Sequence, residues 1–146
     1  QDYMVTLKKK NITCGCILEG TLVSTEEGMR PIETVHIGDK VFSPETGCFV
    51  DVINTWSGFE RSDLTELSAG GATVTVTGYH PVFTPRGYVA AKHLKTGDTV
   101  LSGQGYMASV TVNQVPGYDT KVFNLDTEGN KGFAAGSGTG LWVYIP

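Results

Sequence analysis

An internal repeat constrains the fold of this chain more than any single segment does. The run Gly-Asp-x-Val-x-Ser occurs at residues 38–43 and again, 59 positions later, at residues 97–102. Further residues match at the same offset without a gap, namely Val23, Thr25 and Gly28 with Val82, Thr84 and Gly87, and Asn54 with Asn113. A constant offset over this length indicates that one structural unit has been duplicated. We therefore predict two related subdomains that face each other across an approximate two-fold axis.

Each subdomain is expected to consist of β-strands. Short alternating segments are separated by turns that contain glycine or proline, and no segment keeps a period of 3.6 over the length of a helix. The 19 glycines are scattered without a short period, as is typical of turns. A hairpin is expected through Gly70-Gly71, and one short helical turn over residues 31–35. The predicted strands are residues 3–7, 21–24, 40–43, 48–56, 64–67, 72–77, 82–83, 99–101, 106–115, 121–125 and 141–145.

Composition excludes several classes of function. The formal net charge of the 146 residues is −4, and the single basic run, Lys8-Lys9-Lys10, is interpreted as a solvated strand end. No apolar run has the length needed to span a membrane. The three cysteines are an odd number, which excludes a complete disulfide framework and leaves the compartment open. We expect no nucleic-acid or membrane partner, no cofactor, and a monomer by default.

The repeat offers a way to bring a cysteine and a histidine together. Under the 59-residue shift His80 falls on Thr21, which opens the strand to which Cys16 leads. Cys16 follows Gly15 directly, so its thiol lies next to a glycyl peptide bond, where the absence of a Cβ reduces crowding at the carbonyl. A thiol is partly thiolate at neutral pH and is a fair nucleophile.

This arrangement suits an N-to-S acyl shift, in which the Cys16 sulfur attacks the Gly15 carbonyl. An amide nitrogen leaves poorly unless it is protonated, and a positioned histidine that supplies the proton contributes roughly 10²–10⁴-fold. Thr77 lies three residues before His80, and its hydroxyl can anchor the same peptide unit. The predicted reaction converts the Gly15–Cys16 bond into a thioester.

Two motifs in this chain resemble those of Hint domains, the self-processing modules of inteins, bacterial intein-like proteins and Hedgehog proteins. The segment from Cys16 to Val23, followed by Gly28 and Gly38-Asp39-Lys40-Val41, is similar to the amino-terminal motif of that family. Thr77-Gly78-Tyr79-His80-Pro81 is similar to the second motif. Residues 122–126 and the closing strand resemble the carboxy-terminal motifs.

The resemblance implies a compact all-β horseshoe with two pseudo-symmetric subdomains, and it assigns roles to residues. Cys16 is expected to be the nucleophile, His80 the acid toward the Gly15–Cys16 amide, and Thr77 its orienting partner. Residues 1–15 would be the tail of a covalently linked upstream protein, and residues 16–146 the domain itself. The activity would be single-turnover autoproteolysis. The resemblance also slightly favours a secreted or cell-surface precursor.

The sequence departs from the family pattern near its carboxy end. The positions of the cyclising His-Asn pair look like Tyr144-Ile145, so full splicing is not expected. An upstream aspartate and histidine are replaced by Asn124 and Lys131, with Asp126 two residues beyond Asn124 as a partial substitute. These three residues are treated as auxiliary. We expect amino-terminal cleavage only, by water or an external nucleophile.

Other interpretations remain open at this level. The chain could be an inactive all-β module for binding or connection. Cys14 and Cys16 could form a disulfide that acts as a redox gate on the nucleophile. A metal site on Cys14, Cys16 and His80 would need a fourth ligand, and we expect the remaining histidines, His36 and His93, at the surface. No metal site is therefore predicted. We expect Cys48 to be structural, and Trp56 and Trp142 to pack in the core or at an edge.

Overall fold

A computed structural model describes residues 16–69, 71–102, 107–117, 119–137 and 141–143. The described residues are mostly β-strands, so the all-β prediction is confirmed. Among them, no helix is long and apolar enough to cross a membrane. The strands are β1 (Ile17–Leu18), β2 (Leu22–Thr25), β3 (Gly28–Pro31), β4 (Lys40–Ser43), β5 (Cys48–Glu60), β6 (Leu64–Ala69), β7 (Ala72–Thr77), β8 (Pro81–Thr84), β9 (Gly87–Ala90), β10 (Thr99–Leu101), β11 (Met107–Ser109), β12 (Thr111–Val115), β13 (Thr120–Thr127), β14 (Phe133–Ala135) and β15 (Leu141–Val143). Three short 3₁₀ turns are η1 (Ile32–Thr34), η2 (Ala91–His93) and η3 (Glu128–Asn130).

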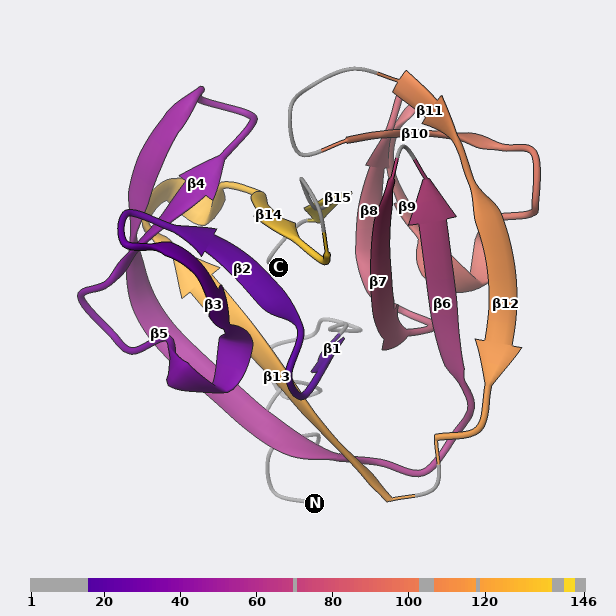
Figure 1. Ribbon diagram of the computed structural model, residues 1–146, viewed down its shortest axis with the longest axis horizontal. Coiled ribbons are helices and arrows are strands. Elements are labelled where there is room, and N and C mark those ends of the chain that lie inside the picture. The colour runs from indigo at the N-terminus through magenta and orange to yellow at the C-terminus, as the bar shows by residue number, and fades with distance from the viewer. Residues whose placement is uncertain (1–15, 70, 103–106, 118, 138–140, 144–146) are drawn as a thin grey trace.

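The strands form one continuous path that is folded into a horseshoe. Its order is β12-β6-β7-β1-β13-β5-β4-β2-β14-β15-β8-β9, with β3 added to β2, while β10 and β11 pair separately. Figure 1 shows two lobes, and the long strands β5 and β13 run along the bottom of the view toward the second lobe. β1 lies low in the space between the lobes (Figure 1). The predicted horseshoe is therefore present.

The approximate two-fold axis passes between β1 and β7. Ile17 is paired with Val76, and these residues are 59 positions apart, so each is the repeat equivalent of the other. The strand order on the two sides of this pair is β7-β6-β12 and β1-β13-β5. The axis also passes between the paired strands β14 and β15. Ala135 on β14 pairs with Val23, and Val143 on β15 pairs with Val82. Val23 and Val82 are again repeat equivalents.

Hydrogen bonds in the turns repeat with the sequence. Thr25 Oγ1 donates to Gly28 O over 2.6 Å, and Thr84 Oγ1 donates to Gly87 O over 2.7 Å. Asp39 Oδ2 accepts from His36 N over 2.8 Å, and Asp98 Oδ2 accepts from Lys95 N over 2.9 Å. The glycines of these turns have φ between +96° and +103°, a region that side chains disfavour, which explains why glycine recurs there: Gly28, Gly38, Gly87 and Gly97. The predicted duplication is confirmed at the level of individual bonds.

The predicted gapless offset is wrong beyond residue 43. Phe42 pairs with Phe49, whereas its equivalent Leu101 pairs with Met107, so the second hairpin connection is one residue shorter. Accordingly Gly38 N donates to Val52 O and Gly97 N donates to Val110 O, which are 58 positions apart. Asn54 and Asn113 are therefore not equivalent, and their match in the sequence is a coincidence.

Most of the predicted strands are present, with changes at their ends. Residues 40–43 and 72–77 form strands with the expected bounds, and η1 occupies the expected helical turn. The expected strand over 106–115 is divided in two around Val110, and β5 extends four residues beyond Trp56. Strands β1, β3, β9 and β14 were not predicted, although strands as short as β4 and β10 were. The strand expected at residues 3–7 and the basic run 8–10 lie outside the described residues.

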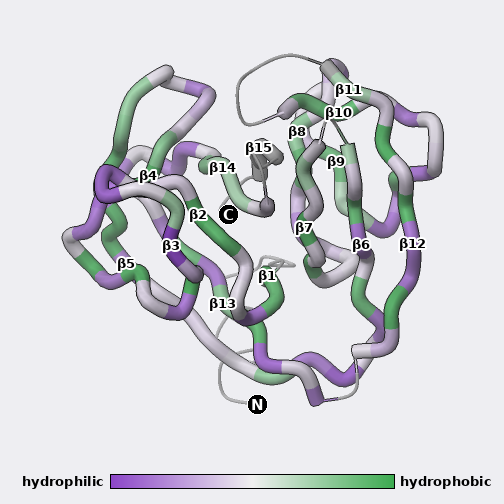
Figure 2. The backbone as a smooth tube through the Cα atoms, viewed as in Figure 1, coloured by the Kyte–Doolittle hydropathy of each residue, from purple (hydrophilic) through white to green (hydrophobic). Residues whose placement is uncertain are grey.

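About half of the buried hydrophobic core consists of repeat-equivalent pairs. Buried pairs are Ile17 and Val76, Val23 and Val82, Ile32 and Ala91, Val35 and Leu94, and Val41 and Val100. Figure 2 shows that β2 is more hydrophobic than β3, its hairpin partner, and every residue of β3 is exposed or half-buried, as expected for an inner and an outer strand. Residues after β14 tie the lobes together, since Gly136 N donates to Leu22 O (2.8 Å) and Ser137 N to Thr73 O (2.9 Å).

Candidate functional site

Cys16 lies at the entry to β1, beside the two-fold axis. Ile17 is in register with Val76 on β7 and with Phe123 on β13. One residue earlier, this antiparallel register places Cys16 opposite Thr77 and opposite Asn124. Residues directly opposite each other in antiparallel strands project to the same face of the sheet. Cys16 is completely buried.

Two hydrogen bonds join Cys16 to Thr77. Thr77 N donates to Cys16 O over 2.8 Å, as in a regular ladder. The return bond differs, because Cys16 N donates to the side-chain Oγ1 of Thr77 over 2.8 Å. The Thr77 carbonyl instead accepts from His80 N over 3.0 Å, which starts the turn after β7. The nitrogen of the peptide bond before Cys16 is thus held by a buried hydroxyl.

His80 lies in the turn that follows Thr77, and its side chain is completely buried. Its carbonyl accepts from Ala91 N over 2.9 Å, just as the carbonyl of Thr21 accepts from Ile32 N over 2.8 Å. The prediction that His80 takes the position of Thr21 in the second repeat is therefore confirmed. Histidine is the side chain whose protonation changes most readily near neutral pH.

The three auxiliary residues lie in different surroundings. Asn124 is buried, faces Cys16 in register, and accepts from Leu125 N through Oδ1 over 2.8 Å. Asp126 accepts from Trp56 Nε1 through Oδ2 over 2.9 Å. Lys131 Nζ lies 3.6 Å from Glu45 Oε2. The register therefore brings Asn124 to the candidate site, whereas the ammonium group of Lys131 is engaged by a carboxylate of the β4–β5 turn.

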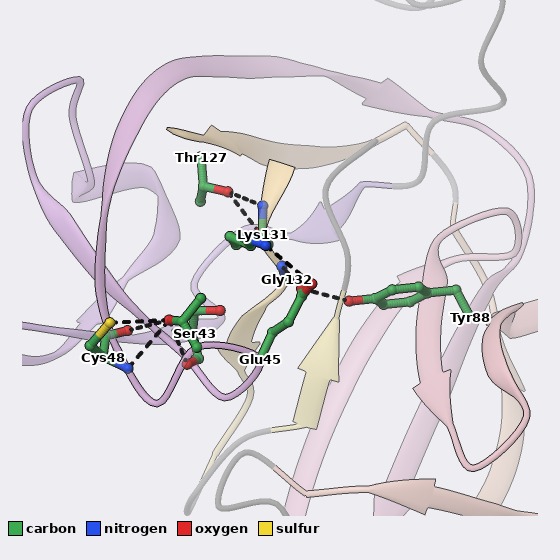
Figure 3. Close-up of polar contacts among 8 residues, drawn as sticks. Ser43, Glu45, Cys48, Tyr88, Thr127, Lys131 and Gly132 are labelled. Carbon is green, nitrogen blue, oxygen red and sulfur yellow. Dashed lines mark hydrogen bonds and ion pairs between the residues drawn. The ribbon is translucent and has the colours of Figure 1, made fainter. Parts of the chain in front are cut away.

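Glu45 links three segments that are far apart in the sequence. Its Oε1 accepts from Gly132 N over 3.1 Å and from the hydroxyl of Tyr88 over 3.4 Å. Figure 3 shows this carboxylate between Tyr88 and the segment of Lys131 and Gly132. Tyr88 belongs to the second repeat, and Glu45 to the first. These contacts couple the two lobes, and no motif in the sequence pointed to Glu45.

The remaining predictions on cysteine and histidine have mixed outcomes. Cys48 is exposed at the start of β5, and its Sγ lies 3.3 Å from Thr46 Oγ1 in the preceding turn; its expected structural role stays a prediction. His36 and His93 are exposed, as expected. Trp56 is half-buried on β5, but the side chain of Trp142 lies outside the described part of the chain. Within that part, no three histidine, cysteine or acidic residues gather as metal ligands would. Cys14, Gly15 and Tyr144-Ile145 also lie outside the described residues.

A family model described as the pretoxin HINT domain matches residues 22–144. The chain belongs to the pretoxin HINT domain family. The match begins after Cys16, so the position of Cys16 rests on the strand register alone. Membership in this family, together with the intein-like fold, supports self-processing in general.

Solved structures of inteins and an intein-like domain share the fold. A bacterial intein-like domain from Clostridium thermocellum is 26% identical with a TM-score of 0.79, and the alignment covers 88% of this chain and 97% of that one. The gp41-1 intein is 18% identical with a TM-score of 0.76, covering 90% and 98%. A DnaB intein from Synechocystis sp. PCC 6803 is 16% identical with a TM-score of 0.77, covering 90% and 99%. No curated protein matches the chain.

The resemblance to Hint domains that the sequence motifs indicated is thus confirmed. Domains of this kind are embedded in a precursor with segments on either side, which agrees with the covalently linked upstream partner expected for this HINT domain.

Proposed function

We propose that this HINT domain converts the peptide bond between Gly15 and Cys16 into a thioester, which water or an external nucleophile then cleaves without splicing. Residues 1–15 would leave as the tail of the upstream protein. The observation that carries the proposal is the buried hydrogen bond of 2.8 Å from Cys16 N to Thr77 Oγ1. It singles out the nitrogen that the reaction must release.

In the proposed shift, the Cys16 sulfur attacks the Gly15 carbonyl carbon through a five-membered ring. The new C–S bond replaces the C–N bond, the thiol gives up its proton, and the amide nitrogen gains one to become a free amine. Thr77 Oγ1 accepts the N–H of Cys16. In a planar peptide the nitrogen lone pair is delocalised into the carbonyl, so an acid can protonate this nitrogen only if the peptide bond is twisted out of plane. A hydroxyl that holds this N–H in a buried position supports such a distortion.

His80 is assigned the proton in this proposal. It is buried, and its backbone N–H is bonded to the carbonyl of Thr77, so the same turn positions the hydroxyl and the imidazole. Asn124, which faces Cys16 across β1 and β13, is assigned an auxiliary role at the thioester. Asp126 and Lys131 are given no direct role, because Trp56 and Glu45 engage them.

The test uses the purified full chain, incubated with dithiothreitol or hydroxylamine and analysed by mass spectrometry. The expected products are a fragment that ends at Gly15 and one that begins at Cys16. Cys16→Ala should abolish cleavage, whereas Cys48→Ala, at the exposed cysteine, should leave it unchanged. Thr77→Val should slow cleavage by about three- to tenfold, because a hydrogen bond contributes about 0.5–1.5 kcal/mol.

The alternatives give different outcomes in the same experiment. An intact mass under every condition would identify an inactive all-β module and contradict the proposal. A change with oxidant but no chain break would favour a redox switch through Cys14 and Cys16. Reductant dependence that persists in Cys14→Ser would show that Cys14 is not the gate.

A further inference from the structure

Strand β13 continues past the point where its pairing with β1 ends. Within the described residues, that pairing ends at Phe123, which lies opposite Ile17. β13 runs on to Thr127 and is paired with β5 along its other edge. Cys16 is the first residue that the structure describes, and the Cα atom of the residue before it lies about 3.8 Å away. The edge of β13 beyond Phe123 is therefore a strand edge within reach of the segment upstream of Cys16.

The second half of the molecule shows the equivalent edge with a strand on it. β6 is the counterpart of β13, because β6 lies beside β7 as β13 lies beside β1. β7 begins at residue 72, four positions before the equivalent of Ile17, and residues 72–75 all pair with β6. Under the 59-residue shift these four residues correspond to residues 13–16. The repeat thus provides a template for an antiparallel strand over residues 13–16 on β13.

The register of β1 on β13 determines which residues would face each other in such a strand. Extended past the start of β1, it places position 14 opposite Asp126. Glu19 N donates to Lys121 O over 3.1 Å, and hydrogen-bonded and non-hydrogen-bonded pairs alternate along an antiparallel ladder. By this alternation Gly15 would be in a hydrogen-bonded pair. Position 14 and Asp126 would form a non-hydrogen-bonded pair, in which side chains approach more closely.

A contact on the neighbouring strand shows to which face Asp126 projects. Trp56 Nε1 donates to Asp126 Oδ2 over 2.9 Å, and Trp56 lies opposite Asn124. Asp126 therefore shares a sheet face with Asn124 and Cys16. Because alternate residues of a strand project to the same face, a side chain at position 14 would project to that face as well.

The equivalent pair in the second half makes a direct side-chain contact. Ser68 lies opposite Thr73, and their hydroxyl oxygens are 3.1 Å apart. A contact of this kind with Asp126 would be selective, because an ionised carboxylate only accepts hydrogen bonds, and the single bond from Trp56 does not saturate its lone pairs. A hydroxyl, thiol or cationic side chain would be favoured at position 14, and an acidic one would be repelled. Cys14, a weak donor, belongs to the favoured group.

We propose that the edge of β13 beyond Phe123 binds the residues just upstream of Cys16 as an added antiparallel strand, and that Asp126 selects the side chain at position 14. In strand addition, main-chain hydrogen bonds provide affinity and alternate side chains provide specificity. Asp126 takes no part in the acyl shift, and it acts on the segment that carries Gly15 to the sulfur. Selection during cleavage rests on the proposed function, whereas the pairing itself does not require the thioester.

The pairing is tested by NMR spectroscopy on the full chain carrying Cys16→Ala, which retains residues 1–15. A non-hydrogen-bonded antiparallel pair brings its Cα atoms within about 4.5 Å of each other. A nuclear Overhauser effect is therefore expected between the α-protons of Cys14 and Asp126. The amide proton of Gly15 should exchange slowly with solvent, because it would be bonded to β13. Absence of the α-proton contact together with fast exchange at Gly15 would overturn the pairing.

The selection is tested by dithiothreitol cleavage of Cys14→Lys and Cys14→Glu, each prepared with Asp126 and with Asp126→Asn. Asparagine retains an acceptor for Trp56 Nε1 and removes the charge. With Asp126 present, Cys14→Lys should be cleaved about two- to tenfold faster than Cys14→Glu, because opposite charges in a cross-strand pair attract and like charges repel. In Asp126→Asn this ratio should fall toward one. Glu128→Gln removes an exposed carboxylate two residues away and should leave the ratio unchanged.

The outcomes distinguish this inference from the proposed function. A ratio that is the same with Asp126 and with Asp126→Asn, in chains that dithiothreitol cleaves normally, would overturn the selection and leave the thioester in place. An α-proton contact between Cys14 and Asp126, with no cleavage of any chain by dithiothreitol, would support the pairing but contradict the thioester, and the selection with it.

Discussion

Thr21 and His80 occupy the same backbone position in the two halves of the molecule. Thr21 N donates to Leu18 O over 3.2 Å, and His80 N donates to Thr77 O over 3.0 Å. Their carbonyls accept from the first residue of η1 and of η2, respectively. The side chains differ, since Thr21 Oγ1 donates to Leu18 O over 2.6 Å and is half-buried, while the imidazole of His80 is completely buried.

Leu18 and Thr77 form the other unequal pair beside the axis. Both accept a backbone hydrogen bond from the residue three positions later, but only Thr77 carries a hydroxyl, and that hydroxyl binds Cys16 N. One scaffold is thus used twice, and the chemistry of the proposed site is confined to residues where the copies differ. The comparison teaches that symmetry provides the proximity, and that a few asymmetric side chains provide the reactivity.

The largest expected effect comes from removing the side chains that differ between the two halves. His80→Ala should slow the release of residues 1–15 by dithiothreitol about 10²–10⁴-fold, as expected for the loss of a positioned acid. Thr21→Ala, at the equivalent position, should change the rate less than threefold. Rate constants from mass spectrometry at a fixed pH provide the measurement.

A control is needed because His80 is buried. Circular dichroism and thermal unfolding of both variants should show that each is folded at the temperature of the assay, and His80→Gln offers a second, polar replacement of similar size. If Thr21→Ala and His80→Ala slow the reaction to the same degree, the two positions contribute only to the scaffold, and the assignment of the acid is wrong.

A smaller effect, on stability, is expected at two positions where the halves carry the same residue. Thr25 and Thr84 are both nearly fully buried, and each accepts a backbone N–H over 3.1 Å in addition to its bond to the turn glycine. Thr25→Val and Thr84→Val should each lower the free energy of unfolding by about 1–3 kcal/mol, because each leaves buried polar groups without their partner. Equilibrium unfolding in urea measures both.

Because the two turns make the same bonds, the two losses should agree within about 0.5 kcal/mol, the spread of hydrogen-bond contributions in mutational series. A large difference between them would show that the two turns contribute unequally to stability in spite of their matching bonds. Neither change should alter the thioester chemistry beyond its effect on the folded fraction.

The repeat could be predicted from sequence because its turns depend on particular residues. These turns need a glycine with positive φ and an aspartate that binds the backbone three residues earlier. Both residue types can be recognised in the sequence, as at Gly38-Asp39 and Gly97-Asp98. The one-residue change of offset after Ser43 could not be predicted, because strand pairing rather than residue type defines it. A chance identity, Asn54 with Asn113, then concealed the change.

The site was only partly predictable for a similar reason. Cys16, Thr77 and His80 stand in recognisable motifs, but β1 has only two residues and carries no periodic signal. Its register determines that Asn124 faces Cys16, and such a long-range pairing has no local signature. Lys131 is the opposite case. It was expected near the site, but an ion pair holds its side chain at Glu45 in the β4–β5 turn.

The smallest expected effect concerns a pair of charges present in one half only. Lys40 on β4 pairs with Asp51 on β5 and forms a hydrogen-bonded ion pair with it, whereas the equivalent strand pair, β10 with β11, has Thr99 opposite Ser109. The hydrogen bond to the Asp51 carboxylate, followed by the charge of Asp51, raises the pKa of Lys40 above its ordinary value. Because the pKa is higher in the folded than in the unfolded state, this pair stabilises the fold fully below the ordinary pKa of lysine. The stabilisation is lost as the pH rises through the folded pKa.

Subtracting one variant from the wild type isolates this small contribution. The difference in melting temperature between wild type and Lys40→Gln should be constant from neutral pH to about pH 10 and should shrink above it, as the ordinary lysine pKa near 10.4 is passed. Thr99→Gln makes a matched replacement in the other half and should show no such decrease. Both residues of the ion pair are about 42% exposed, so added salt should reduce the difference at neutral pH as well. A melting-temperature difference that grows with pH would mean that the fold favours the uncharged form of Lys40. The pKa of Lys40 would then be lowered rather than raised, and the ion pair would not distinguish the two hairpins.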